Sequence, residues 1–337
     1  MANRQGARSH WVVLWLVSLI LGSAVAACAG PDLTTGTTPI ARPGANPSGR
    51  ILFVQHGHLA VWQDGKIQQL GDVSDAAWAR WSPDGQRIAY VRMGDSYSDL
   101  WVANADGSAA KALTRNQPSG QPGTYNYVQQ AVWALMPAWL PDGSTIAYIS
   151  DLNTAKNFLW LISSTGGQPR LVGATTRLGD NIEWPSVSPD GQRVVFALRV
   201  TGETELQRRT DLWVVNLTTG EVAPLVQGGD GNYAPAWSPD GQWIAFVSRH
   251  GEQNDLAVVS ARGGQPVQLT TLGTVAAPAW SPDGQQLAFL VAEKDGSFSV
   301  EAVRFSVDAN GTPQASTPSK LFSAPDIDAR SGLSWSR

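Results

Sequence analysis

Five aspartates recur at one position of a repeated motif, and these regularly spaced carboxylates are the residues most open to a chemical role. The motif reads Trp-Ser-Pro-Asp-Gly in three copies, with Leu for Ser in one other copy and Val for Trp in another. Ser can cap the first position of a type I turn, Pro presets φ at the second, and Gly closes the fourth. We therefore expect structural turn residues, not a carboxylate cluster, at Asp84, Asp142, Asp190, Asp240 and Asp283.

Histidine offers a second kind of chemistry, that of a metal site. His56, His58 and His250 are the histidines beyond the N-terminal segment. Zinc and manganese sites normally need three or four convergent ligands, so a site here requires a fold that brings these side chains together. We predict no metal and no cofactor, and keep a polysaccharide-active or metal-dependent, lyase-like enzyme as the alternative.

Nucleophilic catalysis lacks its motif in this sequence. A serine hydrolase of the α/β type carries its nucleophile in a G-x-S-x-G elbow, and this pentapeptide does not occur. We also expect no α/β-hydrolase domain after Arg337. We therefore expect a protein that is not a peptidase and not an enzyme.

The strands that position these residues follow from the repeat. Each motif is followed by a segment such as Ile88–Tyr90, and successive aspartates are 58, 48, 50 and 43 residues apart, which is the period range of propeller blades. β-branched and aromatic flanks favour strands, so the motif joins an inner strand to the next one out. A third strand such as Asp99–Val102 and a short fourth strand such as Ala112–Thr114 complete an antiparallel blade of four strands.

The two ends of the repeat region complement each other. Leu333–Ser336 matches an inner strand, whereas Ile51–Val54 matches a second strand that no inner strand precedes. The first blade should therefore be closed by the C-terminal strand, which leaves no open sheet edge. Five internal motifs and this split blade predict an all-β, six-bladed β-propeller over residues 50–337. We expect packing between neighbouring blades from Trp81, Trp139, Trp237, Trp280 and Trp335.

The N-terminal residues are typical of a targeting segment. Arg4 and Arg8 precede an apolar stretch that leads into Cys28, the only cysteine. The stretch is short for a membrane span and typical of a signal peptide, and the small residues before Cys28 resemble a bacterial lipobox. This predicts a lipoprotein signal peptide (1–27), a lipidated Cys28 that begins a flexible tether (28–49), and a location in the cell envelope outside the cytoplasm. An uncleaved N-terminal membrane anchor is the alternative.

Charge excludes one class of partner. The net charge is −4 at pH 7, and no long basic run occurs, so the electrostatic basis of nucleic-acid binding is lacking. We predict no nucleic-acid partner and no oligomer.

Loops between blades are the expected binding surface. They are uneven in length, share one face near the channel, and contain aromatic, basic and acidic side chains. Loops on a rigid scaffold often carry function, and the excess of acids favours a basic or polar peptide or a cation. The candidate partner-binding residues are Tyr125, Tyr127, Arg177, Asp180, Asn181, Trp184, Asp230, Tyr233, Asp326 and Asp328.

The repeated Trp-Ser-Pro-Asp-Gly-x-x-Ile-Ala-Phe pattern resembles the WD-like propeller repeat of the TolB family and of prolyl-oligopeptidase-type peptidases. The resemblance covers about residues 50–337 and implies a protein- or peptide-binding propeller, with an unidentified partner in the cell envelope. The sequence differs from the TolB family because only a tether separates Cys28 from Ile51, with no α/β domain between them.

Overall fold

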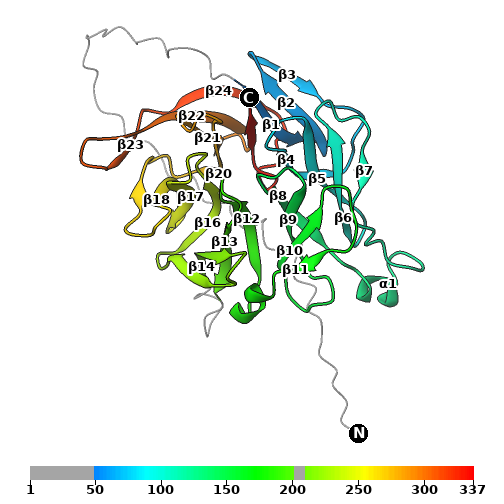
Figure 1. Cartoon of the computed structure of the whole chain (residues 1–337). Coiled ribbons are helices and arrows are strands. Elements are labelled where there is room, and N and C mark those ends of the chain that lie inside the picture. Colours follow the sequence, from blue (N-terminus) through cyan, green and yellow to red (C-terminus); the bar gives the residue numbers. More distant parts are fainter. Residues whose placement is uncertain (1–48, 201–208) are drawn as a thin grey trace, which may run out of the picture. The chain divides into compact units, whose positions relative to one another are not determined.

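The computed structural model of the chain describes residues 49–200 and 209–337. The predicted signal peptide, Cys28 and nearly all of the predicted tether lie outside the described residues. The described part forms six antiparallel sheets, which Figure 1 shows arranged as blades around a common centre. No helix among the described residues is long and apolar enough to cross a membrane.

Each blade runs outward from an inner strand. From the inner to the outer edge, the first three blades are β25 (Ser334–Ser336), β1 (Arg50–Gln55), β2 (His58–Gln63) and β3 (Lys66–Gln69); β4 (Ala76–Trp81), β5 (Arg87–Met93), β6 (Ser98–Asn104) and β7 (Lys111–Ala112); and β8 (Ala134–Trp139), β9 (Thr145–Ser150), β10 (Phe158–Ser163) and β11 (Arg170–Leu171).

The other three blades repeat this order. They are β12 (Ile182–Val187), β13 (Arg193–Val200), β14 (Arg209–Asn216) and β15 (Val222–Val226); β16 (Gly231–Trp237), β17 (Trp243–His250), β18 (Gln253–Ser260) and β19 (Val267–Gln268); and β20 (Val275–Trp280), β21 (Gln286–Ala292), β22 (Phe298–Val307), β23 (Pro313–Ala315) and β24 (Ser319–Ala324). A short helix α1 (Tyr125–Gln129) and a 3-10 helix η1 (Gly173–Leu178) lie between blades.

The sixth blade departs from the four-stranded pattern. One half of β22 pairs with β24, which takes the place of a fourth strand, and the other half pairs with β23 in a hairpin extension. Phe305 in this extension packs edge-on against Trp280, with ring centroids 4.9 Å apart. The extension therefore adds a cover over the inner strand of its own blade.

The predicted closure of the ring is confirmed. Strand β25 pairs antiparallel with β1, with Ile51 opposite Trp335. Because β25 serves as the inner strand of the first blade, the inner edge of β1 is paired.

The core lies between the blades. Residues Ile51–Val54 of the second strand in the first blade are at most 1% exposed, because the neighbouring blades pack against both faces of that strand. One cluster of buried side chains joins Phe53 and Trp62 of the first blade to Leu290 and Phe322 of the sixth. Packing between blades thus provides the apolar burial that holds the ring together.

Five of the six inner strands contain a kink at the same place. The register of the inner strand shifts by a β-bulge in the second to sixth blades. The residue three positions before the motif's first residue has positive φ in each blade. These six residues, which we call the bulge ring, are Trp78, Met136, Trp184, Ala234, Ala277 and Gly332.

Candidate ligand surfaces of the propeller

The propeller has two faces of different construction. The hairpin face carries the five Ser-Pro-Asp-Gly-type turns between the first and second strands. The loop face, on the opposite side, carries the loops that lead from one blade to the next. Inner strands run from the loop face to the hairpin face, so the bulge ring lies along the channel between them.

Aspartates on the hairpin face bind within their own turns. The Ser82 hydroxyl donates to Asp84 Oδ1 at 2.5 Å, and the Gln86 N–H donates to the same oxygen at 3.0 Å. These two hydrogen bonds, the hydroxyl one being the larger cause, lower the pKa of Asp84. The Gly85 N–H closes the turn onto the Ser82 carbonyl at 2.8 Å. The same serine–aspartate bond occurs at Asp190, Asp240 and Asp283.

Asp142 lies in the one turn that has leucine in place of serine. Its carboxylate accepts from the backbone N–H groups of Ser144 and Thr145 instead. All five repeated aspartates therefore lie in hairpin turns, and each carboxylate binds groups of its own turn.

Tryptophans of the inner strands pack under cations from the preceding blade. The guanidinium of Arg87 lies 4.8 Å from the ring centroid of Trp139, and Arg193 lies equally far from that of Trp237. Such cation–π contacts contribute about 0.5–1 kcal/mol at partly exposed sites. These rings also form part of the channel wall.

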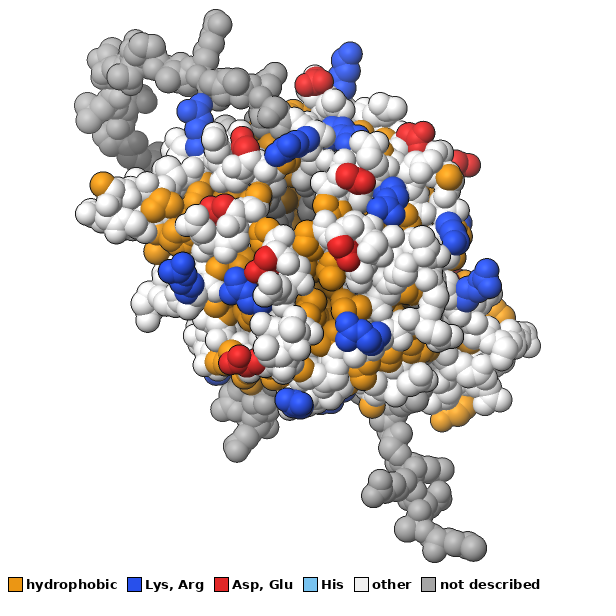
Figure 2. All heavy atoms as spheres, viewed as in Figure 1, with side chains coloured by type: hydrophobic (Ala, Val, Ile, Leu, Met, Phe, Trp, Pro, Cys, Tyr) orange, Lys and Arg blue, Asp and Glu red, His pale blue; other side chains and the backbone are white. Residues whose placement is uncertain are grey.

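A cavity of about 300 Å³ occupies the channel. Its lining extends from the bulge ring, including Met136 and Trp184, to hairpin prolines such as Pro83 and Pro239, so the cavity reaches the hairpin face. Figure 2 shows a hollow near the centre of the propeller that is edged by hydrophobic side chains. Among the lining residues, Arg80 alone has a charged side chain.

A second hollow, of about 380 Å³, lies on the loop face, and we call it the loop hollow. Its residues come from the first blade, the second blade and the loop that precedes β25. They are His56, Gly57, Asp75, Ala76, Ala77, Met93, Asp326, Ile327, Asp328 and Arg330. The structure thus brings two predicted site residues, Asp326 and Asp328, into one concave surface.

The carboxylates of the loop hollow differ in how many hydrogen bonds they accept from neighbouring side chains and in how exposed they are. Asp328 accepts from Arg330 Nε at 3.0 Å and from the Ser331 hydroxyl at 2.7 Å. Asp326 is exposed and lies 3.3 Å from His56 Nε2, and Asp75 is exposed as well. Asp75 was not among the residues expected from sequence, because it lies in a loop of ordinary length with no aromatic neighbour.

Other predicted site residues are dispersed. Tyr125 is 75% exposed, but Figure 1 shows α1 at the outer side of the propeller, away from the inner strands. Tyr127 is 2% exposed, so its side chain offers no surface, contrary to expectation. One tyrosine is exposed and the other buried because Tyr125 and Tyr127 lie on different sides of one helical turn.

The remaining candidates have mostly structural surroundings. Arg177 is exposed on η1, whereas Asp180 is 8% exposed and its carboxylate accepts from the Asn181 N–H. Asp230 accepts from the Gly251 N–H at 2.6 Å. Burial raises the pKa of Tyr233 to about 12. Trp184 belongs to the bulge ring in the channel wall.

Loops on the loop face are held by a repeated residue that begins the third strand. Asp255 is 4% exposed and accepts from the Leu272 N–H, the Gly273 N–H and the Thr270 hydroxyl. Asp99 accepts from the Asn116 N–H in the same way. The sequence pattern contained these aspartates, but their role as anchors of the next inter-blade loop was missed.

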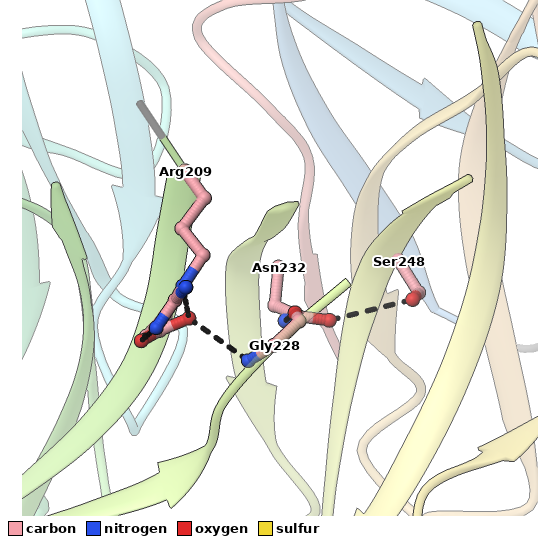
Figure 3. A network of polar contacts seen from close by, with 5 residues as sticks. Arg209, Gly228, Asn232 and Ser248 are labelled. Carbon is pink, nitrogen blue, oxygen red and sulfur yellow. Dashed lines mark hydrogen bonds and ion pairs between the residues drawn. The ribbon is translucent and has the colours of Figure 1, made fainter. Parts of the chain in front are cut away.

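The anchor of the fourth blade extends into a longer network (Figure 3). Asp211 accepts from Arg209 Nε at 3.1 Å and from the Gly228 N–H at 3.2 Å. Asn232 donates to the Gly228 carbonyl at 2.9 Å and accepts from the Ser248 hydroxyl at 3.3 Å. Polar contacts therefore connect β14 of the fourth blade with β16 and β17 of the fifth.

His58 occupies the anchor position of the first blade. Its Nδ1 lies 2.7 Å from the Val73 carbonyl, in the loop that leads to β4. Since a carbonyl only accepts, Nδ1 carries the proton in this contact. His56 pairs with Asp326, and His250 lies 3.3 Å from the Ser248 hydroxyl. Within residues 49–200 and 209–337, no three His, Cys, Asp or Glu side chains are grouped so that they could hold a metal ion.

A closed six-bladed ring of four-stranded sheets, with Trp-Ser-Pro-Asp-Gly turns on one face, defines a β-propeller of the TolB type. The family model of the TolB beta propeller domain matches residues 120–325, and the chain belongs to this family. The model of the dipeptidyl peptidase IV N-terminal region matches residues 53–156.

Proteins named as peptidases and proteins named TolB are both similar to parts of this sequence. An uncharacterized peptidase, YuxL of Bacillus subtilis, is 26% identical over 226 residues, covering 56% of this chain and 31% of that protein. Dipeptidyl-peptidase 5 of Porphyromonas endodontalis is 28% identical over 211 residues, 52% of this chain and 30% of that protein. The Tol-Pal system protein TolB of Anaeromyxobacter dehalogenans is 37% identical over 79 residues, 21% of this chain and 18% of that protein. The chain thus spans less than a third of the length of each.

Solved structures share the fold. TolB from Acinetobacter baumannii superposes with a TM-score of 0.62 at 19% identity, over 86% of this chain and 67% of that one. A putative TolB from Agrobacterium tumefaciens gives a TM-score of 0.57 at 18% identity, over 87% of this chain and all of that one. At this identity the likeness concerns the propeller architecture, which hosts unrelated functions.

Proposed function

We propose that this propeller is a protein- or peptide-binding module that contacts its partner through the loop hollow. The observation that carries the proposal is the concave surface formed by Asp75, Asp326 and their neighbours, where three segments of the chain meet. Two of its carboxylates are exposed, so a basic or polar segment of a partner is the occupant that this surface favours.

Backbone conformation in the loop hollow supports a binding role. His56, Asp75 and Asp326 all have φ between 50° and 60°, a left-handed region that is uncommon for residues other than glycine. Such strained residues cluster at functional sites. The strain is held by long-range contacts, such as the His56 N–H bound to the Asp326 carbonyl at 3.2 Å.

Family membership agrees with this function. The name of one relative places TolB in the Tol-Pal system, and a propeller without a grouped metal site among its described residues is suited to recognition. The chain spans less than a third of the length of YuxL, dipeptidyl-peptidase 5 and TolB, so its partner is to be identified directly.

The test is crosslinking in intact cells with a matched set of variants. A double variant, Asp75→Asn with Asp326→Asn, removes two charges while asparagine tolerates the left-handed backbone. Asp64→Asn is the control, because Asp64 is also exposed and left-handed but lies in the β2–β3 turn outside the loop hollow. We expect the double variant to lose at least about tenfold of the crosslinked partner, as for charged hydrogen-bonding contacts, and the control to keep it. Equal recovery with all three chains would refute the loop hollow as the binding surface.

We also propose that lipid on Cys28 attaches the protein to a membrane of the cell envelope, on the side outside the cytoplasm. The support is the sequence before Cys28 and the propeller's relation to an envelope system protein. Cells labelled with radioactive palmitate provide the test. Cys28→Ala should abolish the label and release the protein into the soluble fraction, whereas an unchanged membrane fraction would contradict lipid anchoring.

A peptidase activity is the second candidate, because two relatives carry peptidase names and the dipeptidyl peptidase IV model matches residues 53–156. The binding function predicts that the purified chain leaves dipeptidyl chromogenic amides intact. Hydrolysis that copurifies with the chain and is stopped by a serine-directed inhibitor would support the peptidase instead.

A further inference from the structure

The channel cavity is lined by one cation and by small, apolar or aromatic side chains, and polar atoms, including those of Ser186 and Ser334, also form part of its surface. Its lining includes four prolines that follow the bulge ring, and also Trp81, Trp139, Trp237, Trp280 and Trp335. Arg80, from the inner strand of the second blade, is the single ionisable side chain among the lining residues. A lone charge in such a place is costly unless something binds it.

The wall of the cavity is lopsided. The bulge ring carries large side chains in the second, third and fourth blades, at Trp78, Met136 and Trp184, and of these Met136 and Trp184 line the cavity. Small residues occupy the same positions in the fifth, sixth and first blades, at Ala234, Ala277 and Gly332. The Arg80 guanidinium lies directly over Gly332, where a Cβ atom would come within 3.1 Å of Arg80 Nη2.

Only one nitrogen of the Arg80 guanidinium has protein partners among the described residues. Nη1 donates to the Ala79 carbonyl and to the Ser331 carbonyl, both at 2.8 Å, which uses both of its hydrogens. A guanidinium has five N–H donors, so the edge formed by Nε and Nη2 keeps three. This edge has the fork geometry that binds a carboxylate through two parallel hydrogen bonds.

Arg80 remains a cation when the cavity is empty. Burial lowers its pKa to about 10, which is still well above neutral pH. The described residues include no carboxylate paired with it, although other arginines of the chain do pair, such as Arg199 with Glu183. The positive charge is therefore available to an incoming anion.

We propose that Arg80 is the anchor of an anion site in the channel, which takes a carboxylate carried by an apolar body and admits it from the hairpin face. One guanidinium with a free fork matches one carboxylate, whereas a doubly charged phosphate would leave charge unmatched among prolines and tryptophans. A volume of about 300 Å³ is at the small end for ligand pockets, so the occupant is a small carboxylic acid or the C-terminal residues of a peptide. The channel cavity shares none of its lining residues with the loop hollow, so this proposal does not depend on the function proposed there.

Calorimetry with defined probes tests the proposal. The probes are N-acetyl-phenylalanine, N-acetyl-Ala-Ala-Phe, the C-terminal amide of each, and inorganic sulfate. We expect one or both acids to bind with a Kd at or below about 1 mM, and each amide to bind at least about tenfold more weakly because the charged hydrogen bonds are lost. Tighter binding of the tripeptide than of the single residue identifies a peptide C-terminus as the source of the carboxylate, and the reverse order identifies a free acid.

Variants tie the binding to the named group. Arg80→Gln should weaken binding of the acids at least about tenfold, and Gly332→Ala should weaken it by crowding Nη2 while the charge remains. Arg304→Gln is the control, because Arg304 is exposed on β22 and lies outside the cavity; it should bind as the wild type does. If Arg80→Gln does not fold, the NMR signal of the Arg80 Nε–H in the wild-type chain serves instead, and it should shift on addition of the acid but not of the amide.

Three outcomes would overturn the anion site. The first is equal affinity for the acids and their amides. The second is no binding of the acids to the wild-type chain at about 10 mM. The third is binding of the acids with no change in the Arg80 NMR signal, or with the same affinity for Arg80→Gln as for the wild type. A lowered melting temperature of Arg80→Gln without acid binding by the wild type would leave Arg80 as a structural link between the first two blades.

Discussion

On the hairpin face the repeated turns are held by their own residues, whereas on the loop face four loops are held by a residue of another strand, at His58, Asp99, Asp211 and Asp255. Asp240 binds the Ser238 hydroxyl and the Gln242 N–H, both two residues away. Asp255 binds the Leu272 and Gly273 N–H groups, 17 and 18 residues further along the chain. Local turns can be copied from blade to blade without regard to neighbours, while the loops can vary in length as long as their anchors remain.

Removal of a loop anchor should have the largest effect on stability. Asp255→Ala leaves the Leu272 and Gly273 N–H groups and the buried Thr270 hydroxyl without their acceptor, so we expect the free energy of unfolding to fall by about 3 kcal/mol. Urea unfolding followed by tryptophan fluorescence measures the change. Asp255→Asn keeps one acceptor oxygen and should recover part of the loss; a loss below that of a hairpin aspartate would reverse the comparison between the faces.

The histidine anchor should matter less than a carboxylate anchor. His58→Ala removes one neutral hydrogen bond to the Val73 carbonyl, and we expect a loss of about 1 kcal/mol. His58→Gln, which can still donate, is the matched variant. Thermal unfolding with and without a chelator gives the measurement, and a drop in melting temperature caused by the chelator alone would indicate a metal at His58 instead of an anchor.

A hairpin aspartate should contribute least among the three. Asp240→Ala opens bonds that lie at the surface, where water can replace them, so we expect a loss of at most about 1 kcal/mol. The same chemical denaturation series provides the value. A loss as large as that of Asp255→Ala would show that the turns are not self-contained.

Acidity should affect Asp84 of the hairpin face and Asp99 of the loop face in opposite directions. Since hydrogen bonds from Ser82 and Gln86 lower the pKa of Asp84, its stabilising contribution is complete above the ordinary aspartate pKa of about 4 and is lost as pH falls through the lower folded value. Burial is the main cause that raises the pKa of Asp99. Its contribution is therefore present below about pH 4 and is lost as pH rises through the raised folded value.

Unfolding between about pH 3 and pH 7 tests this difference. Relative to the wild type, Asp84→Asn should become less stable as pH rises, and Asp99→Asn should become more stable. This change in stability with pH should be smaller than the stability losses expected for Asp255→Ala, His58→Ala and Asp240→Ala, because Asp84 is exposed and screened by solvent. Slopes of the same sign for the two variants would contradict the opposite assignment.

Much of the architecture could be predicted because it depends on local sequence motifs that repeat along the chain. The Trp-Ser-Pro-Asp-Gly turns, the blade count and the pairing of Leu333–Ser336 with the first blade depend on patterns that recur along the chain. The sites depend instead on contacts between distant segments. Nothing near Arg80 in the sequence indicates a cavity, since its free edge arises from Ser331 and Gly332 at the other end of the chain. Likewise, the burial of Tyr127 follows from the packing of a five-residue helix that the loop composition did not reveal.

The pairing of β25 with β1 has a consequence for synthesis. A ribosome delivers Ile51 almost three hundred residues before its partner Trp335, so the first blade waits with an unpaired inner edge while the other five are made. During that interval the edge is open to pairing with strands of other nascent chains. The strand that completes the first blade is therefore made after the strands of all other blades, and a chain that stopped within the sixth repeat would leave the ring open.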